Sequence, residues 1–369
     1  MPVSLTQSAL FFVTLGALAI QFVYWLVNLI SILRKSTEVK GQKKPVSVIV
    51  CAHNEFENLK KLIAHLLQQD HPNFEIIIVD DRSDDGTYDY LLELKEEKVK
   101  FVRVDKVHDH INTKKYAITL GAKAATHDVL LFIDADCVPN SKKWIHTMSS
   151  SMTKDKIFAI GVSQYSLQKG LLNQWVRFEA LITAINYVGF ALSGNPYMAV
   201  GRNLVYKKSF FLDNNPFSKF QNVTGGDDDL LVNHFAHKKN TIVSIGKNAL
   251  TYSIPKSTWK EYFAQKIRHI SVSKYYRFSD KILLGLQNLS HSIFWLALIT
   301  FAVLVSYEIA AAIFILRVLL MVNLTFWTSK KFGDRMNIWL VPLFDILYVL
   351  YISVLGTRAI FTKKVKWKK

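Results

Sequence analysis

The stretch that most constrains the fold is PVSVIVCAHNEFENLKKLIAHLLQQ, residues 45–69. Its first seven residues are mainly β-branched and apolar, which predicts a buried strand. From Asn54 onward, apolar residues recur at helical spacing, and Asn54 with Glu57 matches a helix-capping arrangement. We therefore expect a buried strand followed directly by an amphipathic helix.

The same strand and helix unit repeats along the chain. Further strands are predicted at 74–80, 99–104 and 128–134, with helices around 87–97 and 114–125. Alternating helices and apolar strands predict an α/β fold with a parallel sheet that is covered on both faces. Ligands of such sheets bind beyond the carboxyl ends of the strands, so the functional side chains are expected there.

Long hydrophobic stretches flank this region. Residues 9–33 carry no charge and are long enough to cross a bilayer, which needs about 20 helical residues. No basic segment precedes them and no small-residue cleavage site follows, so an anchor is favoured over a signal peptide. Three further hydrophobic stretches lie near 286–306, 309–328 and 338–361.

These patterns predict three parts of the chain: an anchor at 1–40, an α/β domain at 41–280 ending in an interfacial helix, and a membrane region at 281–369. The anchor is followed by a basic cluster, namely Arg34, Lys35, Lys40, Lys43 and Lys44. Such a cluster favours a cytoplasmic position for the domain that follows. We expect a multi-pass integral membrane protein, in the cell membrane if the source is bacterial.

The orientation of the C-terminal segments stays open. Three crossings would place the basic tail KKVKWKK outside, against the tendency of basic residues to stay inside, so one segment is expected to be interfacial or re-entrant. The net charge of +17 arises largely beside hydrophobic segments, where bases meet anionic headgroups, and no nucleic-acid motif is present. Cys51 and Cys137 are interpreted as small buried residues.

Two carboxylates one residue apart end the fourth predicted strand, in LLFIDADC at 130–137. In an extended chain Asp134 and Asp136 would point to the same side. Two such charges are costly together unless a cation neutralises them, and their oxygens suit Mg²⁺ or Mn²⁺. A surface turn is the alternative, but the position after a buried strand favours a metal site.

A second acidic pair, Asp80 and Asp81, ends the second strand, where a carboxylate can accept hydrogen bonds from a ribose or a base. The glycine fingerprint of dinucleotide-binding folds is absent after the first strand. A helix cap is the alternative role, for which Ser83, Asp84 and Asp85 are better placed.

Two later segments could also carry chemistry. In GGDDD, residues 225–229, a carboxylate could act as a general base or simply cap a helix. The segment WKEYFAQKIRHISVSKYYRF at 259–278 mixes aromatic and basic residues, as interfacial helices do. Its Arg268 could contact an anionic diphosphate.

Taken in order, these blocks resemble the family 2 glycosyltransferases with a GT-A fold. The resemblance covers about residues 45–275, and it is to the membrane-integrated branch related to cellulose, hyaluronan and poly-N-acetylglucosamine synthases. The blocks that carry it are VSVIVCAHNE, IIIVDDRSDDGT, KKYAITLGAKAATHDVLLFIDAD, GGDDDLL and QKIRH. It implies a Rossmann-like nucleotide-sugar-binding domain flanked by transmembrane helices.

The resemblance also implies roles for single residues. Donor or nucleotide binding falls to Asp80, Asp81, Lys114, Asp134 and Arg268. The metal falls to Asp136 with Asp134, the general base to Asp227 with Asp228 as the alternative, and the acceptor or diphosphate side to Gln265, His269, Gly201 and Asn203.

Two positions depart from the family pattern. His269 stands where processive synthases carry Trp, which speaks against long-polymer synthesis, and Gly226 replaces the first member of the acidic pair. The expected activity is metal-dependent, inverting transfer from a nucleotide-sugar, usually UDP-linked in this family, to a glycan or other acceptor at the membrane. The alternatives are a polyprenyl-phosphate glycosyltransferase that loads a lipid carrier, and a catalytically silent nucleotide-sugar-binding membrane protein.

Overall fold

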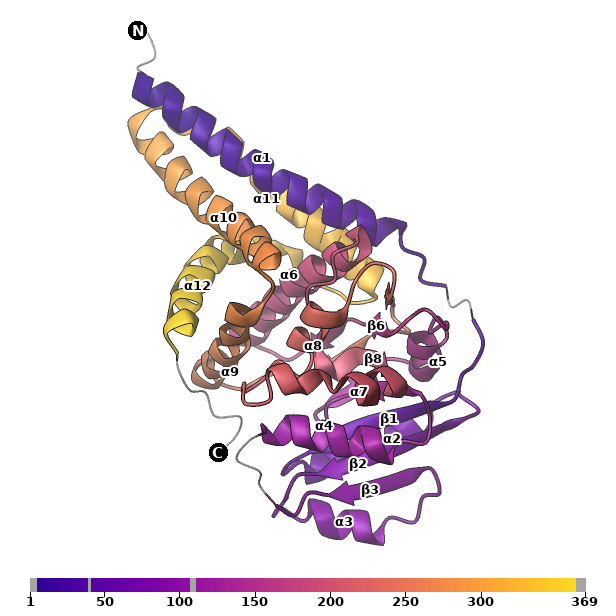
Figure 1. The fold of residues 1–369 in the computed structure, drawn as a ribbon. Coiled ribbons are helices and arrows are strands. Elements are labelled where there is room, and N and C mark those ends of the chain that lie inside the picture. The colour runs from indigo at the N-terminus through magenta and orange to yellow at the C-terminus, as the bar shows by residue number, and fades with distance from the viewer. Residues whose placement is uncertain (1–4, 39–40, 107–110, 363–369) are drawn as a thin grey trace.

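A computed structural model describes residues 5–38, 41–106 and 111–362 of the chain. Lys40 of the basic cluster and the tail KKVKWKK therefore lie outside the described residues. The described part combines an α/β domain with an elongated arm of helices, in which α1, in indigo, runs beside α10 and α11 (Figure 1).

The α/β domain is built on a seven-stranded sheet with the order β3-β2-β1-β4-β8-β6-β9. The four predicted strands are present and mutually parallel, as expected. β8 pairs antiparallel with β4 and with β6, so the whole sheet is mixed rather than parallel throughout. The strands are β1 (Val46–Ala52), β2 (Phe74–Asp80), β3 (Val99–Arg103), β4 (Val129–Phe132), β6 (Phe158–Ile160), β8 (Leu204–Lys207) and β9 (Thr241–Val243).

Helices cover both faces of this sheet. Ile49, on one face of β1, lies under α4 (Thr113–Ala124), where Gly121 leaves no room for a Cβ: an added one would lie 2.8 Å from the Ile49 side chain. Val48 and Val50 point to the other face and pack with the buried leucines of α2 (Phe56–Leu67). Because successive side chains of β1 point to opposite faces of the sheet, this strand contributes to the core on both faces.

The capping predicted for Asn54 is wrong. The N-cap of α2 is Glu55, and Asn54 instead takes a left-handed conformation with φ 56°. Its side-chain oxygen accepts a hydrogen bond of 2.9 Å from the backbone N–H of Asp84. Asn54 therefore joins two loops at the carboxyl edge of the sheet, one before α2 and one before α3 (Thr87–Glu93).

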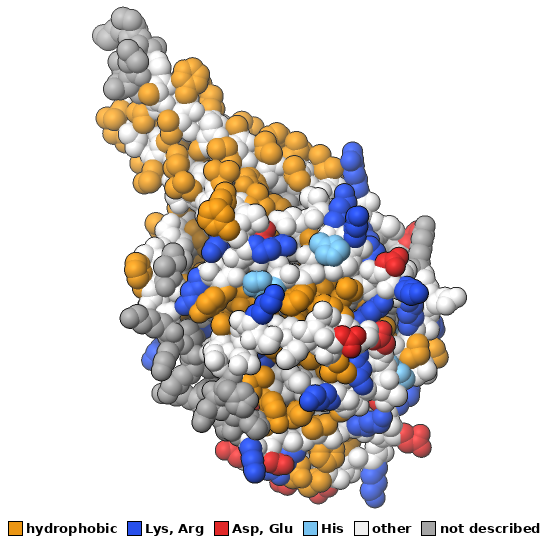
Figure 2. Space-filling model, viewed as in Figure 1, with side chains coloured by type: hydrophobic (Ala, Val, Ile, Leu, Met, Phe, Trp, Pro, Cys, Tyr) orange, Lys and Arg blue, Asp and Glu red, His pale blue; other side chains and the backbone are white. Residues whose placement is uncertain are grey.

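Four helices of the described chain are long and apolar enough to cross a membrane. They are α1 (Leu5–Arg34), α10 (Phe278–Leu304), α11 (Tyr307–Phe332) and α12 (Val341–Phe361). Hydrophobic side chains cover the arm, and Lys and Arg side chains begin where it meets the α/β domain (Figure 2). α6 (Leu171–Ser193) packs against α1, and α12 packs against α9 (Trp259–Ser271).

The charges that interrupt the predicted membrane segments are paired. The Arg317 guanidinium on α11 binds both carboxylate oxygens of Asp345 on α12, at 2.6 and 3.0 Å. Its Nη1 donates to Gln21 of α1 at 2.8 Å, and His291 of α10 lies 3.2 Å from Asp345. This buried ion pair, together with its contacts to Gln21 and His291, therefore connects all four helices.

Candidate active site

The Asp134–Asp136 pair lies in a turn, not in the extended segment that we expected. β4 ends at Phe132, and the N–H of Cys137 donates to the Asp134 carbonyl at 3.0 Å. The turn still brings the ligand atoms of Asp134, Asp136 and Cys137 within 4.8 Å of one another. The two carboxylates can therefore serve one ligand, although strand alternation is not the reason.

The electrostatics of this turn suit a divalent cation. Burial, followed by the nearby Asp134 and Glu55, raises the pKa of Asp136. Burial also raises the pKa of Cys137, so its thiol stays protonated and lies 3.4 Å from the Asp136 carboxylate as a donor. The oxygens of Asp134 and Asp136 form the hard donor set that Mg²⁺ or Mn²⁺ requires.

The acids at the end of β2 keep free oxygens. Asp80 and Asp81 are buried, and one carboxylate oxygen of each has no hydrogen-bond partner among the described residues. The other oxygens accept from the Ser83 N–H at 3.3 Å and the Arg82 side chain at 2.8 Å. Because a buried unpaired oxygen is costly, these two atoms suit hydrogen-bond donors of a ligand.

Cys51, near the end of β1, marks the point where the acids of three segments meet. Burial raises the pKa of its thiol to about 12, with Asp134, Asp227 and Asp81 adding to the rise and Lys114 opposing it. Lys114, Asp134 and Asp227 border one cavity with Cys51, and the N–H of Asp81 donates to the carbonyl of Ala52, the next residue of β1.

Lys114, at the start of α4, bridges two of the acids. Its Nζ lies 3.3 Å from Asp134 and 3.2 Å from Asp227. Although burial opposes ionisation, Lys114 holds the pKa of Asp227 below its usual range. A cavity of about 20 Å³, which has room for about one water molecule, borders these three residues.

The carboxylates of Asp228 and Asp229 accept hydrogen bonds from nearby backbone N–H groups, and Asp229 also accepts one from a tyrosine. Asp228 caps α8 (Asp229–Phe235), accepting from the Asp229 N–H at 2.8 Å and from the Gly201 N–H at 2.5 Å. Asp229 accepts from Tyr276 at 2.9 Å and from the Leu230 N–H at 2.8 Å. Of the three adjacent acids, Asp227 is thus the one whose described partner is a charged side chain, Lys114.

Lys115 was missed by sequence reasoning. It is fully buried and donates to the carbonyls of Val223 and Gly225. It therefore holds the loop in which Gly225 and Gly226 adopt positive φ, 83° and 75°, just before Asp227. Its only sequence signal is a second lysine beside Lys114 at the start of a predicted helix.

α9 brings one further predicted group to the site. The Arg268 guanidinium lies 3.3 Å from the His269 ring. Burial, then the charges of Arg268, Lys266, Arg202 and Lys114, lower the pKa of His269 well below its usual range. His269 is therefore neutral and surrounded by bases, whereas the Gln265 side chain makes no hydrogen bond with the described residues.

Asn203 is not available to an acceptor, which corrects its expected role. Its side chain is fully buried and hydrogen-bonded to Trp144 at 3.0 Å and to the carbonyls of Val162 and Ala249 at 2.6 and 2.7 Å. Gly201 keeps its place beside the acids, since an added Cβ would lie 3.1 Å from the Asp228 carboxylate.

A three-stranded sheet supports the turn of Asp134 and Asp136. Its order is β5-β10-β7, with β5 (Cys137–Pro139), β10 (Thr251–Ser253) and β7 (Ser163–Tyr165). Adjacent residues of a strand point to opposite faces. Ser253 reaches toward Asp136, at 3.5 Å, so one face of the small sheet looks toward the site.

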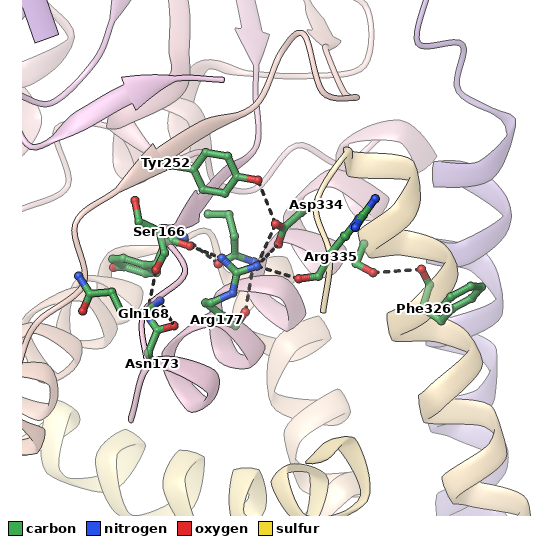
Figure 3. A network of polar contacts seen from close by, with 11 residues as sticks. Ser166, Gln168, Asn173, Arg177, Tyr252, Phe326, Asp334 and Arg335 are labelled. Atoms are coloured by element: carbon green, nitrogen blue, oxygen red, sulfur yellow. Dashed lines mark hydrogen bonds and ion pairs between the residues drawn. The ribbon is translucent and has the colours of Figure 1, made fainter. Parts of the chain in front are cut away.

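The opposite face contacts the connection between two membrane helices. Tyr252 donates to Asp334, in the loop between α11 and α12, at 3.0 Å. Arg177 of α6 binds both oxygens of Asp334, at 2.9 and 3.0 Å, and the carbonyl of Arg335 at 2.8 Å. In Figure 3 Arg177 lies at the centre of this network, between the small sheet and the loop.

Arg202 is a second residue that sequence reasoning missed, although it lies between Gly201 and Asn203. Its Nε donates to the Ser163 hydroxyl at 2.8 Å, and its guanidinium lies over the Tyr165 ring, 5.0 Å from its centroid. Burial alone would lower the pKa of Arg202, but neighbouring ionisable groups, the Asp134 carboxylate among them, raise it. This places a permanent cation near the Asp134–Asp136 turn.

Residues 47–213 match the sequence model of glycosyl transferase family 2. A mouse protein named inactive polypeptide N-acetylgalactosaminyltransferase-like protein 5 is 35% identical over 116 residues, which are 30% of this chain and 26% of that protein. The 4,4'-diaponeurosporenoate glycosyltransferase of Staphylococcus haemolyticus is 34% identical over 111 residues, 30% of this chain and 29% of that enzyme.

A longer match is to the poly-beta-1,6-N-acetyl-D-glucosamine synthase of Staphylococcus aureus, 24% identical over 204 residues, 52% of this chain and 48% of that enzyme. The chain thus spans between about a quarter and a half of the length of these relatives.

Among solved structures, a mannosyltransferase from Pyrobaculum calidifontis in complex with GDP-Man and Mn²⁺ superposes with a TM-score of 0.57 at 16% identity, over 94% of this chain and 99% of that one. This likeness concerns the fold, and it confirms the predicted GT-A class.

Proposed function

We propose, from the premise that residues 47–213 form a family 2 glycosyl transferase domain, that the whole chain is a membrane-bound, inverting glycosyltransferase that uses a nucleotide-sugar. The observation that carries this proposal is that Lys114, Asp134 and Asp227 meet at one cavity beside Cys51, with Asp81 bonded through its N–H to the next residue of β1, Ala52. A nucleoside, a diphosphate and an acceptor hydroxyl each need one of these groups. A silent binding protein would need no acid beside the acceptor.

The nucleoside half of the donor is proposed to lie at the end of β2. There the free oxygens of Asp80 and Asp81 would accept hydrogen bonds from the base or ribose. The diphosphate would lie over the Asp134–Asp136 turn, with Arg268 assisting. The P. calidifontis enzyme was solved with GDP-Man and Mn²⁺, which supports a nucleotide-sugar and a divalent ion here, and we favour a UDP-linked donor.

Asp136, oriented by Asp134, would hold Mg²⁺ or Mn²⁺. When bound, such an ion stabilises the negative charge that builds on the leaving diphosphate. Asp227 would remove the proton of the acceptor hydroxyl, which then attacks the anomeric carbon from the face opposite the diphosphate. Asp228 is the less suitable base, because both of its oxygens already accept backbone N–H groups.

The four apolar helices support a membrane protein. We propose that its α/β domain faces the cytoplasm, where nucleotide-sugars are made. We retain the division into an anchor at 1–40, a catalytic domain at 41–280 and a membrane region at 281–369. The acceptor would be a glycan or a lipid carrier reached from the bilayer surface.

The proposal is tested with the purified full-length protein and a panel of UDP- and GDP-sugars. We expect release of UDP or GDP that depends on Mg²⁺ or Mn²⁺, is abolished by EDTA, and is lost in Asp136→Asn without a change in membrane insertion. Extracting the product into organic solvent separates a lipid-linked sugar from a glycan. Turnover that is unchanged in Asp136→Asn would contradict the metal assignment.

A further inference from the structure

The Arg202 guanidinium is held on one side only. Ser163 accepts from its Nε, Tyr165 lies beneath its plane, and Thr251 donates to its backbone carbonyl at 3.4 Å. Neither Nη1 nor Nη2 has a hydrogen bond or an ion pair within the described ranges. The small sheet therefore fixes the position of the guanidinium. Its two terminal nitrogens form a planar fork of donors that has no acceptor among the described residues.

Arg202 is connected to both halves of the proposed site. Arg202 binds Ser163 of β7, and Ser253 of the neighbouring strand β10 lies 3.5 Å from Asp136. Arg202 also acts on His269 of α9, together with Arg268. Its neighbour Gly201 donates to Asp228, beside the proposed base. Arg202 thus lies where the leaving group and the acceptor would meet.

The charge of Arg202 lacks a direct partner among the residues that the structure describes. A cation bound by Asp134 and Asp136 would neutralise the carboxylates that balance Arg202 in the free protein. Arg202 and Arg268 would then remain as the bases that act on neutral His269, since Lys266 is paired with Glu179 and Lys114 stays paired with Asp227. An anion arriving from a substrate would restore the balance, and a guanidinium fork matches phosphate oxygens in a bidentate geometry.

We propose that Arg202 is a substrate-binding residue whose terminal nitrogens bind a phosphoryl group, either of the donor's diphosphate or of a phosphate-bearing acceptor. This inference rests on the proposed glycosyltransferase function and deepens it. It assigns a recognition role to a residue outside the acidic motifs and the α9 motif. It also makes the small sheet the support for both Arg202 and the Asp134–Asp136 turn.

The test compares Arg202→Gln and Arg202→Lys in the full-length protein in detergent. The matched control is Arg335→Gln, which removes an exposed guanidinium but keeps the carbonyl bound by Arg177. Affinity for UDP and for GDP with Mn²⁺ is measured by calorimetry. Affinity for dodecyl phosphate, with dodecyl maltoside as the uncharged comparison, is measured by thermal shift with the nucleotide saturating.

If the group belongs to the donor, Arg202→Gln weakens nucleotide binding by about tenfold or more, as loss of charge-assisted hydrogen bonds predicts. If it belongs to the acceptor, nucleotide affinity stays unchanged and dodecyl phosphate affinity falls by a similar factor. Arg202→Lys, which keeps the charge without the fork, recovers part of either loss. Should Arg202→Gln fail to fold, Ser163→Ala gives a smaller loss in the same direction.

The proposal is overturned if both affinities in Arg202→Gln equal those of Arg335→Gln, since Arg202 would then only balance Asp136. Asp136→Asn distinguishes an error in the Arg202 inference from an error in the proposed function. If Asp136→Asn abolishes Mn²⁺-dependent nucleotide binding and Arg202→Gln changes nothing, only the Arg202 inference is wrong. If Asp136→Asn also changes nothing, the proposed function itself is contradicted.

Discussion

Replacing Asp227 by Asn tests which of the adjacent acids is the base. Asn cannot take a proton, but its amide keeps the size of the side chain and can still contact Lys114, 3.2 Å away in the native protein. Removal of a positioned general base costs about 10²- to 10⁴-fold in rate. We therefore expect at least a hundredfold loss of nucleotide release in Asp227→Asn, with little change in melting temperature.

Asp228→Asn is the matched comparison. In Asp228→Asn the remaining side-chain oxygen can still accept one N–H, but the other oxygen is replaced by an NH₂ group. Either the cap of α8 or the hydrogen bond from Gly201 is therefore lost. Loss of a cap destabilises a protein by about 1 kcal/mol, so we expect a lower melting temperature and a smaller loss of rate.

The assay follows release of UDP or GDP at saturating nucleotide-sugar, with nucleotide affinity measured separately. We expect both variants to bind nucleotide as the wild type does. The reasoning would be refuted if Asp228→Asn lost more than a hundredfold in rate at an unchanged melting temperature while Asp227→Asn stayed within tenfold of wild type.

Three further changes probe the supports of the fold. Lys115→Met leaves two buried carbonyls without their donor. We expect a lower melting temperature and a rate loss of about tenfold or more, scaled from one to two lost buried hydrogen bonds. An unchanged rate would show that the loop held by Lys115 does not position Asp227. Lys100, Ser47 and Thr126 lower the pKa of Glu75 to about 2 although burial opposes them, so its contribution to stability is complete above its unfolded pKa of about 4.3 and disappears as the pH falls through 2. Glu75→Gln should therefore melt below wild type at pH 7, with a gap that narrows toward pH 3, and a gap independent of pH would contradict this. Asp345→Asn leaves Arg317 buried without its counter-charge, and we expect a loss of about 3 to 5 kcal/mol in the free energy of unfolding, measured in detergent; a change under 1 kcal/mol would show that the pair does not hold the helices together.

The long elements could be predicted from the sequence because each carries its own pattern. Strands β1, β2 and β4 have apolar runs that bury both faces, and the membrane helices have runs long enough to span a bilayer. β6, β8 and β9 have three or four residues each, and so short a run carries no period. The part of the sheet beyond β4, with its antiparallel strand β8, could not be foreseen for that reason.

The sequence pointed to the acids of the candidate site and to Lys114 and Arg268, but not to Lys115 and Arg202. Asp134 and Asp227 stand out because they follow glycines or buried strands in chain order. Lys115 and Arg202 act through carbonyls and hydroxyls that are far away in sequence: Val223 lies 108 residues from Lys115, and Ser163 lies 39 residues from Arg202. Partners of this kind emerge only when the chain is folded.

The contact of Arg177 with Asp334 has a consequence for how the protein can be divided. Both side chains are buried, and they join α6 in the α/β region to a loop between membrane helices. A truncated chain that ends before α10 would keep Arg177 without its carboxylate and Tyr252 without its acceptor. The α/β region and the helical arm should therefore unfold as one cooperative unit, and enzymology on this protein will need the full chain in detergent or lipid.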